Sequence, residues 1–442
     1  MIVTYIQPII FIVLLAVVTF FAVKYYGRVA RNIKMGKPKK IKGNLKSMIL
    51  LALGQKKMFR KPLPAFLHLF VYLAFVVTQI ELIEIIVDGI TGKHRLFMPY
   101  LGGFYTFLIS FIEFLSLGAL IATIFFLYRR NVMKVKRFQQ PEMTGWPKLD
   151  ANIILIAEIF LVCFIFMMNG SDMALQAKGD PHYAQTGSFL FSQMLVGPLQ
   201  GLSASTLIIM ERIGWWGHIL IVFGFILYLP FSKHFHIFLA FPNSYFLEET
   251  PQGEMENMPE ITNEVRLMLD PSAATNTDAP PPEKFGASDI TDLTWKNLLD
   301  AYSCTECGRC TDACPANQTG KKLSPRKVMM DVRDRADELG KFKSNNKEHT
   351  DGKALLSDEY ISKEEIMACT TCNACVTECP VSINPLNIIL ELRRNLILEK
   401  ADSPEEWNLM FTNIENNMAP WQFNPMDRDK WVNDLLNEES EN

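Results

Sequence analysis

Two cysteine-rich segments constrain this chain more than any other feature of its sequence. Residues 304–315 and 369–380 both follow the pattern C-x2-C-x2-C-x3-C-P. Eight of the nine cysteines in the 442-residue chain lie in these two segments. Thiols gathered in this way favour metal binding over a disulfide framework, and free thiols indicate a reducing compartment. We therefore expect a domain built around bound metal.

The spacing of the cysteines predicts two [4Fe-4S] clusters. Three thiolates on one tight loop can reach three irons of a single cluster, and the fourth cysteine, before proline, meets the other cluster. This is the ligand spacing of two-cluster bacterial ferredoxins. Structural zinc is the alternative, but zinc sites use paired C-x2-C motifs without a third cysteine at the same interval. We expect one cluster on Cys304, Cys307, Cys310 and Cys379, and the other on Cys369, Cys372, Cys375 and Cys314.

The first 240 residues are rich in Phe, Ile, Leu and Met, and several of their apolar stretches are long enough to span a bilayer. Residues 5–23 carry no charge, and lysine follows them, which is not the pattern of a cleavable signal peptide. The stretch 188–210 contains Pro198 between two glycines and is interpreted as interfacial or re-entrant. The predicted spanning helices are at about 5–25, 65–88, 102–128, 151–169 and 211–231.

The positive charges of the loops predict the orientation in the membrane. Residues 28–63 carry twelve Lys or Arg and residues 129–148 carry six, whereas residues 170–210 carry only Lys178. Loops rich in positive charge stay in the cytoplasm. We therefore expect a multi-pass protein of the bacterial inner (cell) membrane, with the N-terminus outside and the cysteine domain in the reducing cytoplasm.

Three histidines are candidate cofactor ligands. His68 lies near the cytoplasmic start of the second predicted helix, and His218 near the outer part of the fifth. If the fifth helix continues to His236, the eighteen residues between them place both imidazoles on one face, about 27 Å apart. Imidazoles are common axial ligands of haem iron, although histidines near a membrane interface are often hydrogen-bonded surface groups. His234 is the local alternative to His236, His94 and His182 are predicted to be surface residues of outer loops, and His349 is given no role.

Four glutamates fall within the predicted spans. Carboxylates are costly inside a membrane and indicate function, for instance on a proton path to a quinone. The alternative is pairing with an interfacial cation or a position near the headgroups. These residues are Glu81, Glu84, Glu113 and Glu158.

The segment around Trp215-Trp216-Gly217-His218, with Tyr228–Ile237 and Pro242-Asn243, resembles the membrane cytochrome b subunit of respiratory nitrate reductase. The resemblance implies two haem-ligating histidines, spaced like His218 and His236, on the last helix. That family also carries two ligand histidines ten residues apart on the second helix, and here Thr78 stands ten residues after His68. We therefore expect one haem b between His68 and His236, whereas a second haem at His218 has no evident partner ligand.

The segment from Trp295 through the first cysteine run to Arg326 resembles the small iron–sulfur subunit of heterodisulfide reductase. The two parts together resemble membrane iron–sulfur oxidoreductases of the electron-transfer-flavoprotein:menaquinone type. We expect an all-α chain, in which a five-helix transmembrane cytochrome b bundle precedes a cytoplasmic α-helical ferredoxin domain. The expected parts are a haem b domain at 1–240, an acidic Pro-rich linker at 241–290 containing Pro280-Pro281-Pro282, a two-cluster domain at 291–400 and an acidic tail at 401–442.

Short motifs predict where helices of the cluster domain begin. We expect a helix over Asp292–Ala301, a second from Ser324-Pro325 to Gly340, and a last helix over 386–399 after Asn384-Pro385. Ser362-x-x-Glu365 has the pattern of a capping box. The polar segment 341–358 is expected to be a loop.

The expected function is electron transfer between a cytoplasmic partner, two clusters, haem b and a membrane quinone, with menaquinone as substrate. The alternatives are a membrane anchor and electron wire without its own quinone site, or an iron–sulfur redox sensor. Trp407, Trp421 and Trp431 lie in the acidic tail and predict a docking arm, unless they pack back onto the cluster domain. The expected partner is a soluble Cys-Cys-Gly-type iron–sulfur subunit or a flavoprotein, and no nucleic acid.

Overall fold

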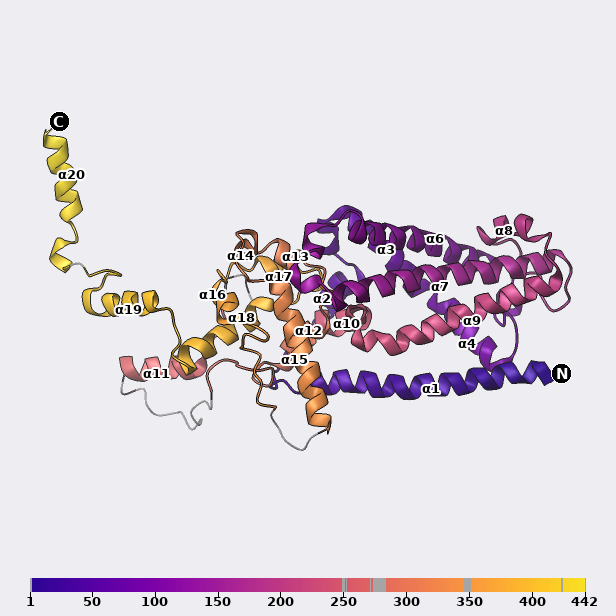
Figure 1. Cartoon of the computed structure of the whole chain (residues 1–442), viewed down its shortest axis with the longest axis horizontal. Helices are drawn as coiled ribbons and strands as arrows, with labels where there is room; N and C mark the ends of the chain where they lie inside the picture. Colours follow the sequence, from indigo (N-terminus) through magenta and orange to yellow (C-terminus); the bar gives the residue numbers. More distant parts are fainter. Residues whose placement is uncertain are drawn as a thin grey trace.

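The computed structural model describes residues 2–248, 251, 253–270, 272, 284–345, 351–422 and 424–441. In this part of the chain the regular structure is helical, and β-pairing is limited to two isolated bridges. The predicted all-α fold is confirmed. Figure 1 shows a bundle of long helices beside a smaller helical domain, with the last two helices extending away from both.

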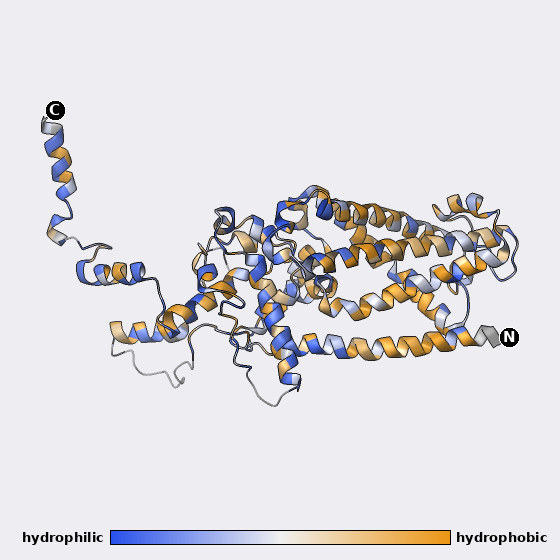
Figure 2. Cartoon of the chain, viewed as in Figure 1, coloured by the Kyte–Doolittle hydropathy of each residue, from blue (hydrophilic) through white to orange (hydrophobic). Residues whose placement is uncertain are grey.

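Five helical spans in the described residues are long and apolar enough to cross a membrane, which is the number predicted. Their outer surfaces carry exposed apolar side chains, such as Ile9, Val13 and Phe20 on the first of them. Figure 2 shows the hydrophobic residues following the length of these helices. The spans are formed by α1 (Ile2–Ile33), α3 (Pro62–Val77) together with α4 (Gln79–Thr91), α6 (Gly103–Asn131), α7 (Trp146–Ala177) and α9 (Ala204–Tyr228).

Several boundaries of the membrane part differ from prediction, and α1, for example, ends eight residues after residue 25. Helix α7 runs eight residues beyond 169, because the polar residues that suggested a loop find partners inside the bundle; Asp172, for example, binds Gln176 at 3.0 Å. The stretch 188–210 is not one segment. It contains α8 (Ser192–Leu199), and its last residues start α9, where the Ser203 side chain accepts a hydrogen bond from the Thr206 amide.

The fifth spanning helix does not continue to His236, so the expected spacing of about 27 Å along one helix is wrong. Helix α9 ends at Tyr228, and the chain turns through Leu229–Phe231, where Pro230 has no amide hydrogen to donate. Ser232 is extended, and its hydroxyl accepts a bond from the His234 amide. Helix α10 (His236–Tyr245) then begins at the predicted ligand itself.

The cluster domain contains three of its helices where the capping motifs placed them. The Ser362–Glu365 capping box starts α16 (Lys363–Met367), and Asn384 caps α18 (Pro385–Arg394). Helix α15 (Pro325–Asn345) starts as predicted but is five residues longer, so the expected polar loop begins later. Helix α12 (Trp295–Tyr302) begins three residues late, because Thr294 forms the capping box. The shorter helices are α13 (Arg309–Asp312), α14 (Pro315–Gln318) and α17 (Ala374–Glu378).

The segment expected to be an acidic Pro-rich linker contains α11 (Pro259–Leu269). Pro280-Pro281-Pro282 and His349 lie outside the described residues. The tail forms α19 (Glu405–Asn417) and α20 (Lys430–Glu441).

The two domains are joined by buried polar contacts at one end of the bundle. Asn32, at the end of α1, donates to Tyr302 Oη and Asp337 Oδ1, both at 2.9 Å. The Lys37 amide donates to the Leu293 carbonyl at 2.7 Å. The basic loops that predict the cytoplasmic face are therefore on the side of the cluster domain.

Candidate functional site

The first cavity of the cluster domain is surrounded by cysteines from both sequence motifs. Cys304, Cys307 and Cys310 come from the loop before α13 and from α13 itself, and Cys379 follows α17. Met329 of α15 and Ile383 are part of the apolar wall of this cavity. The structure therefore brings together the four thiols that the spacing assigned to one cluster.

The second cavity has the complementary set. Cys369, Cys372 and Cys375 share it with Cys314, which lies 55 residues earlier and ends the first motif. Helices α13 and α17 pack against each other, so the two motifs cross and each sends its last cysteine to the other cavity. Cys372 is exposed, which places the second cavity nearer to the surface of the domain.

Both cysteine loops have the same uncommon backbone. Glu306 and Thr371, each two residues after the first cysteine, have positive φ angles of 52° and 57°. Gly308 and Asn373, two residues further, also have positive φ. A positive φ is costly for residues other than glycine and is found where function requires it. The repeated conformation turns the loop amides towards sulfur, and the amides of Glu306 and Thr371 donate to Cys304 and Cys369 at 3.5 and 3.4 Å.

The cavities fit an iron–sulfur cluster better than a single metal ion. Burial raises the pKa values of the Cys304, Cys375 and Cys379 thiols to about 12, so that they need bound cations to be thiolates at neutral pH. Yet no three Cys, His, Asp or Glu side chains in the described part of the chain converge closely enough to hold one ion. Four thiols spread around a cavity suit a cluster of several irons, which argues against structural zinc.

His68 and His236 lie close together at the cluster-side end of the bundle, although they belong to different helices. Their ring centres are 6.5 Å apart, and the planes are tilted by 38°. Two imidazoles that bind one metal through Nε2 at about 2 Å have ring centres about 6 Å apart. His68 Nδ1 is 3.1 Å from Gln55 Oε1, and His236 Nδ1 is 3.0 Å from the Lys233 carbonyl. Contacts of this kind orient a ligand histidine and leave Nε2 for the metal.

His234 lies beside this pair, with its ring centre 5.7 Å from that of His236. Burial lowers the pKa of His234 to about 3 and also lowers the pKa of His236, so both rings are neutral. The nearest carboxylate to His234 is Glu158 on α7, at 3.7 Å from Nε2. This places one of the four predicted intramembrane glutamates next to the histidines.

His218 is buried and faces α7, where its Nδ1 is 3.2 Å from the Leu161 carbonyl. That contact also leaves Nε2 free, as in a metal ligand. At the position expected for a partner on the second span, α3 ends and Thr78 separates it from α4, and the Gln79 side-chain amide donates to the Phe75 carbonyl. The structure therefore does not bring a second histidine to His218 among the described residues.

The first cavity and the histidine pair are joined by a short basic segment. Arg309, which lines the cavity, donates to the carbonyls of Lys57 and Met58 at 3.3–3.4 Å. Four residues later α3 begins and carries His68. Arg60, in the same segment, forms an ion pair at 3.1 Å with Glu378, the residue before Cys379. The sequence motifs indicated neither this segment nor Gln55 as part of the site.

Comparison with known proteins supports the assignment of a domain that binds two iron–sulfur clusters. Residues 303–383 match the family described as "4Fe-4S dicluster domain". The chain is 27% identical over 455 aligned residues to a Bacillus subtilis protein named "Probable iron-sulfur-binding oxidoreductase FadF", covering 95% of this chain and 60% of the relative. It is 27% identical over 434 residues to the "EtfAB:quinone oxidoreductase" of Syntrophomonas wolfei, covering 89% of this chain and 54% of the relative.

A shorter match, 30% identical over 178 residues, is to a "Probable membrane-anchored ferredoxin" of Chromohalobacter salexigens. It covers 36% of this chain and 25% of the relative. No solved structure matches the chain. The predicted relation to iron–sulfur oxidoreductases is confirmed, and the chain spans about 54–60% of the length of the first two relatives.

Proposed function

We propose that this chain is a membrane electron-transfer subunit that connects a cytoplasmic redox partner with a quinone in the bilayer. The observation that carries the proposal is the order of the sites. The second cavity, which has the exposed Cys372, is followed by the first cavity. The first cavity is followed by the segment around Met58, and that segment by the His68–His236 pair in the membrane part. Such an order suits stepwise transfer of single electrons between the cluster domain and the bilayer.

Each cavity would hold one [4Fe-4S] cluster, and the residues around it would set the redox potential. Cluster potentials depend on hydrogen bonds to sulfur, charge and solvent exposure. The Ile383 amide donates to Cys379 at 3.3 Å, and Arg309 adds positive charge near Cys307. Arg393 donates to the Cys369 carbonyl at 2.8 Å beside the second cavity.

The haem b of the proposal would be held by His68 and His236, and when bound it would carry one electron at a time between the cluster domain and the quinone. The fit rests on the 6.5 Å between the two ring centres and on the hydrogen-bonded Nδ1 atoms. Gln55 and the Lys233 carbonyl would keep the rings oriented. His218 would be the protein ligand of a second haem only if its other axial ligand is not a histidine of the second span.

The experiment that tests the haem proposal compares two neighbouring histidines. Replacement of His236 with alanine should remove the α-band of a low-spin haem from the reduced spectrum of the purified protein. His234→Ala is the matched control, because His234 lies beside His236 but is not one of the two proposed ligands. The α-band of the haem should remain in this variant. A wild-type preparation that has iron–sulfur absorbance but no haem band contradicts the proposal.

The expected partner would dock near the second cavity and the tail. Trp421 and Trp431 are 60% and 64% exposed, so they do not pack onto the cluster domain. Exposed tryptophan within an acidic segment suits an interface anchor with a charged rim. The name of the Syntrophomonas relative pairs EtfAB with a quinone. For this chain we propose a flavoprotein or a Cys-Cys-Gly-type iron–sulfur subunit as the partner.

Affinity purification of the native complex tests the partner. A chain truncated after Lys400 should lose the co-purified redox subunit while it keeps the absorbance of both clusters. A truncated chain that retains the subunit, or a full-length chain that binds no redox subunit, contradicts the docking proposal.

The topology of the proposal places the cluster domain in the cytoplasm. The basic loops lie at the cluster end of the bundle, where Lys39 pairs with Glu248 at 2.9 Å and Arg326 donates to the Arg137 carbonyl at 2.6 Å. Positive loops on that side support a cytoplasmic location.

A further inference from the structure

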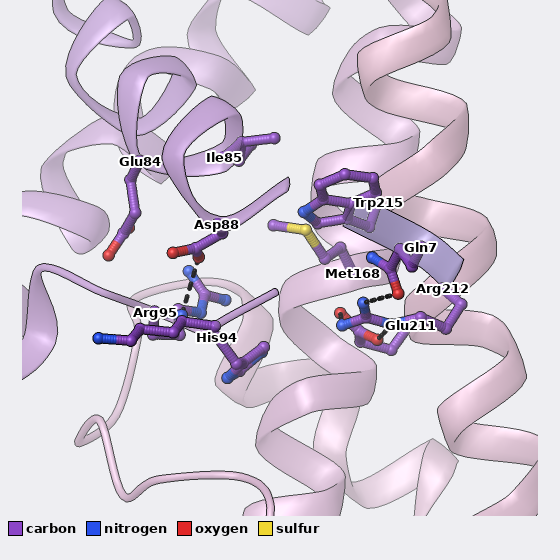
Figure 3. Close-up of a pocket in the computed structure, with 11 residues that line it drawn as sticks. Gln7, Glu84, Ile85, Asp88, His94, Arg95, Met168, Glu211, Arg212 and Trp215 are labelled. Carbon is purple, nitrogen blue, oxygen red and sulfur yellow. Dashed lines mark hydrogen bonds and ion pairs between the residues drawn. The ribbon is translucent and has the colours of Figure 1, made fainter. Parts of the chain in front are cut away.

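The end of the bundle away from the cysteine cavities contains a second buried polar cluster, which the electron path does not use. It gathers around Arg95, in the loop after α4, and a small cavity lies beside it. Figure 3 shows Asp88 and Arg95 on one side of this cavity and Gln7, Glu211 and Arg212 on the other. We name this group the far-end cluster. Its carboxylates are Glu81, Glu84, Asp88, Glu113, Asp172 and Glu211.

Arg95 is the centre of the far-end cluster and is 5% exposed. Its Nε donates to Asp172 at 3.0 Å, and its backbone amide donates to Asp88 at 2.8 Å. Tyr105, which accepts a bond from Arg95 at 3.1 Å, donates to Glu84 at 2.7 Å. Residues from α4, α6 and α7 are thus tied to one guanidinium.

The positive charges in the cluster cannot balance its carboxylates. Among the described residues, the guanidiniums that contact them are those of Arg95 and Arg212, and Arg212 is already paired with Glu211 at 2.6 Å. Lys93 lies at the rim of the cavity. Burial lowers the pKa of His94 to about 4, so that this imidazole is neutral at pH 7. Because an unpaired buried charge is very costly, some of the carboxyl groups must hold a proton.

The hydrogen bonds identify which carboxyl group this is. Glu113 accepts from the amides of Phe191 and Ser192 at 2.8 and 3.1 Å, so its charge is well compensated. Glu81 is different, because it is 4% exposed and its buried Oε1 has no hydrogen-bond partner. The nearest cation is Arg95, at 3.9 Å. A carboxylate in this position lacks the donors that ionisation requires.

His94 is the link from the far-end cluster to the surface. Its side chain is 24% exposed, and Nε2 is 3.5 Å from the buried Asp172. The ring also lies 5.1 Å from Tyr183, and its buried Nδ1 has no hydrogen-bond partner. The expectation that His94 is a plain surface residue is therefore wrong. A neutral imidazole can accept a proton at one nitrogen while it releases one from the other, with no net change of charge.

We propose that the far-end cluster is a proton-exchange site, in which Glu81 holds a proton at neutral pH and exchanges it with the outer solution through His94. The exchange breaks the O–H bond of Glu81 and forms it again with a proton from water, so no electron is required. If the proposed function holds, the site would supply protons, because reduction of a quinone takes up a proton with each electron. This role rests on the proposed function. The proton store itself does not depend on the identity of the electron acceptor.

Infrared spectroscopy of the purified full-length chain in lipid nanodiscs tests the proposal without any redox partner. At pH 7, the wild-type minus Glu81→Gln difference spectrum should contain the C=O band of one protonated carboxylic acid. Glu158→Gln is the matched control, since Glu158 is an intramembrane glutamate outside the far-end cluster. A Glu81→Gln difference spectrum that shows only the loss of ionised carboxylate bands overturns the proposal.

The route is tested by hydrogen–deuterium exchange. His94→Phe should slow the shift of the Glu81 band in D2O at least about tenfold, and Glu158→Gln should leave the rate unchanged. An unchanged rate in His94→Phe overturns the route. If Glu81→Gln does not fold, as judged by cluster absorbance, glutamate labelled with 13C in the Glu158→Gln protein still decides the matter. A missing protonated-glutamate band in that protein contradicts the proton-exchange site. A protein that shows the band but does not react with a quinone contradicts only the proposed function.

Discussion

Replacement of Cys314 with alanine separates crossed ligation from ligation within each motif. Cys314 is 7% exposed and lines the cavity of Cys369, Cys372 and Cys375, although its sequence neighbours line the other cavity. Removal of this thiol leaves three cysteines for one cluster and all four for the other. The expected lesion is therefore confined to one cluster, so that bound iron falls from about eight to about four atoms per chain when that cluster is lost.

The assay combines iron analysis with electron paramagnetic resonance of the reduced protein, and matched variants give the comparison. Cys314→Ala should produce the same spectrum as Cys372→Ala, because both cysteines line the second cavity. Cys310→Ala and Cys379→Ala should share a different spectrum, because both line the first cavity. The reasoning is refuted if Cys314→Ala matches Cys310→Ala.

Two further predictions concern stability. Asp351 is bound by the fully buried Arg335 at 2.6 Å, which lowers the pKa of Asp351 to about 2. A carboxyl group whose pKa is lowered on folding stabilises above its unfolded pKa near 4 and loses that contribution as the pH falls towards 2. Asp351→Asn should therefore lower the urea midpoint at pH 7, and its difference from wild type should shrink below about pH 4; a constant difference speaks against this linkage. Gly36→Ala should lower the thermal midpoint, because a Cβ there would lie 2.6 Å from the backbone of Trp295 and overpacking costs about 1–3 kcal/mol of unfolding free energy. Gly224→Ala, where a Cβ meets nothing within 4 Å, should leave the midpoint unchanged.

The sequence predicts the parts of this molecule that depend on local spacing. The cysteine motifs predict which thiols share a cavity, because the three-residue interval brings thiols of one loop together and the final Cys-Pro turns the chain away. Apolar length predicts the five spans for a similar reason. The capping motif at Ser362 and the cap at Asn384 also start helices where expected.

The spacing argument for His218 and His236 rests on a premise that the structure does not support. The periodic spacing of His218 and His236 assumes one continuous helix, and Pro230 ends that helix. His236 nevertheless lies close to His68, because α10 starts again at the end of the bundle. The family resemblance thus indicated the His68–His236 pair, which helix geometry alone could not predict.

The far-end cluster could not be predicted as a unit. Its groups come from five helices and two loops, and no local motif connects Arg95 with Asp172. The intramembrane positions of Glu81, Glu84 and Glu113 were a visible signal. Arg95, four residues after the end of α4, is a further signal. From the sequence alone it is simply a charged residue of a loop.

The central claim is that electrons pass between the clusters and a quinone through the His68–His236 pair. Stopped-flow mixing of the chemically reduced full-length protein in nanodiscs with a short-chain menaquinone analogue tests it most directly, with cluster absorbance as the readout. We expect rapid reoxidation of both clusters in wild type and in His234→Ala, and reoxidation slowed at least about a hundredfold in His236→Ala. Equal rates in His236→Ala and wild type would contradict the account, as would clusters that the quinone does not reoxidise in any of these proteins.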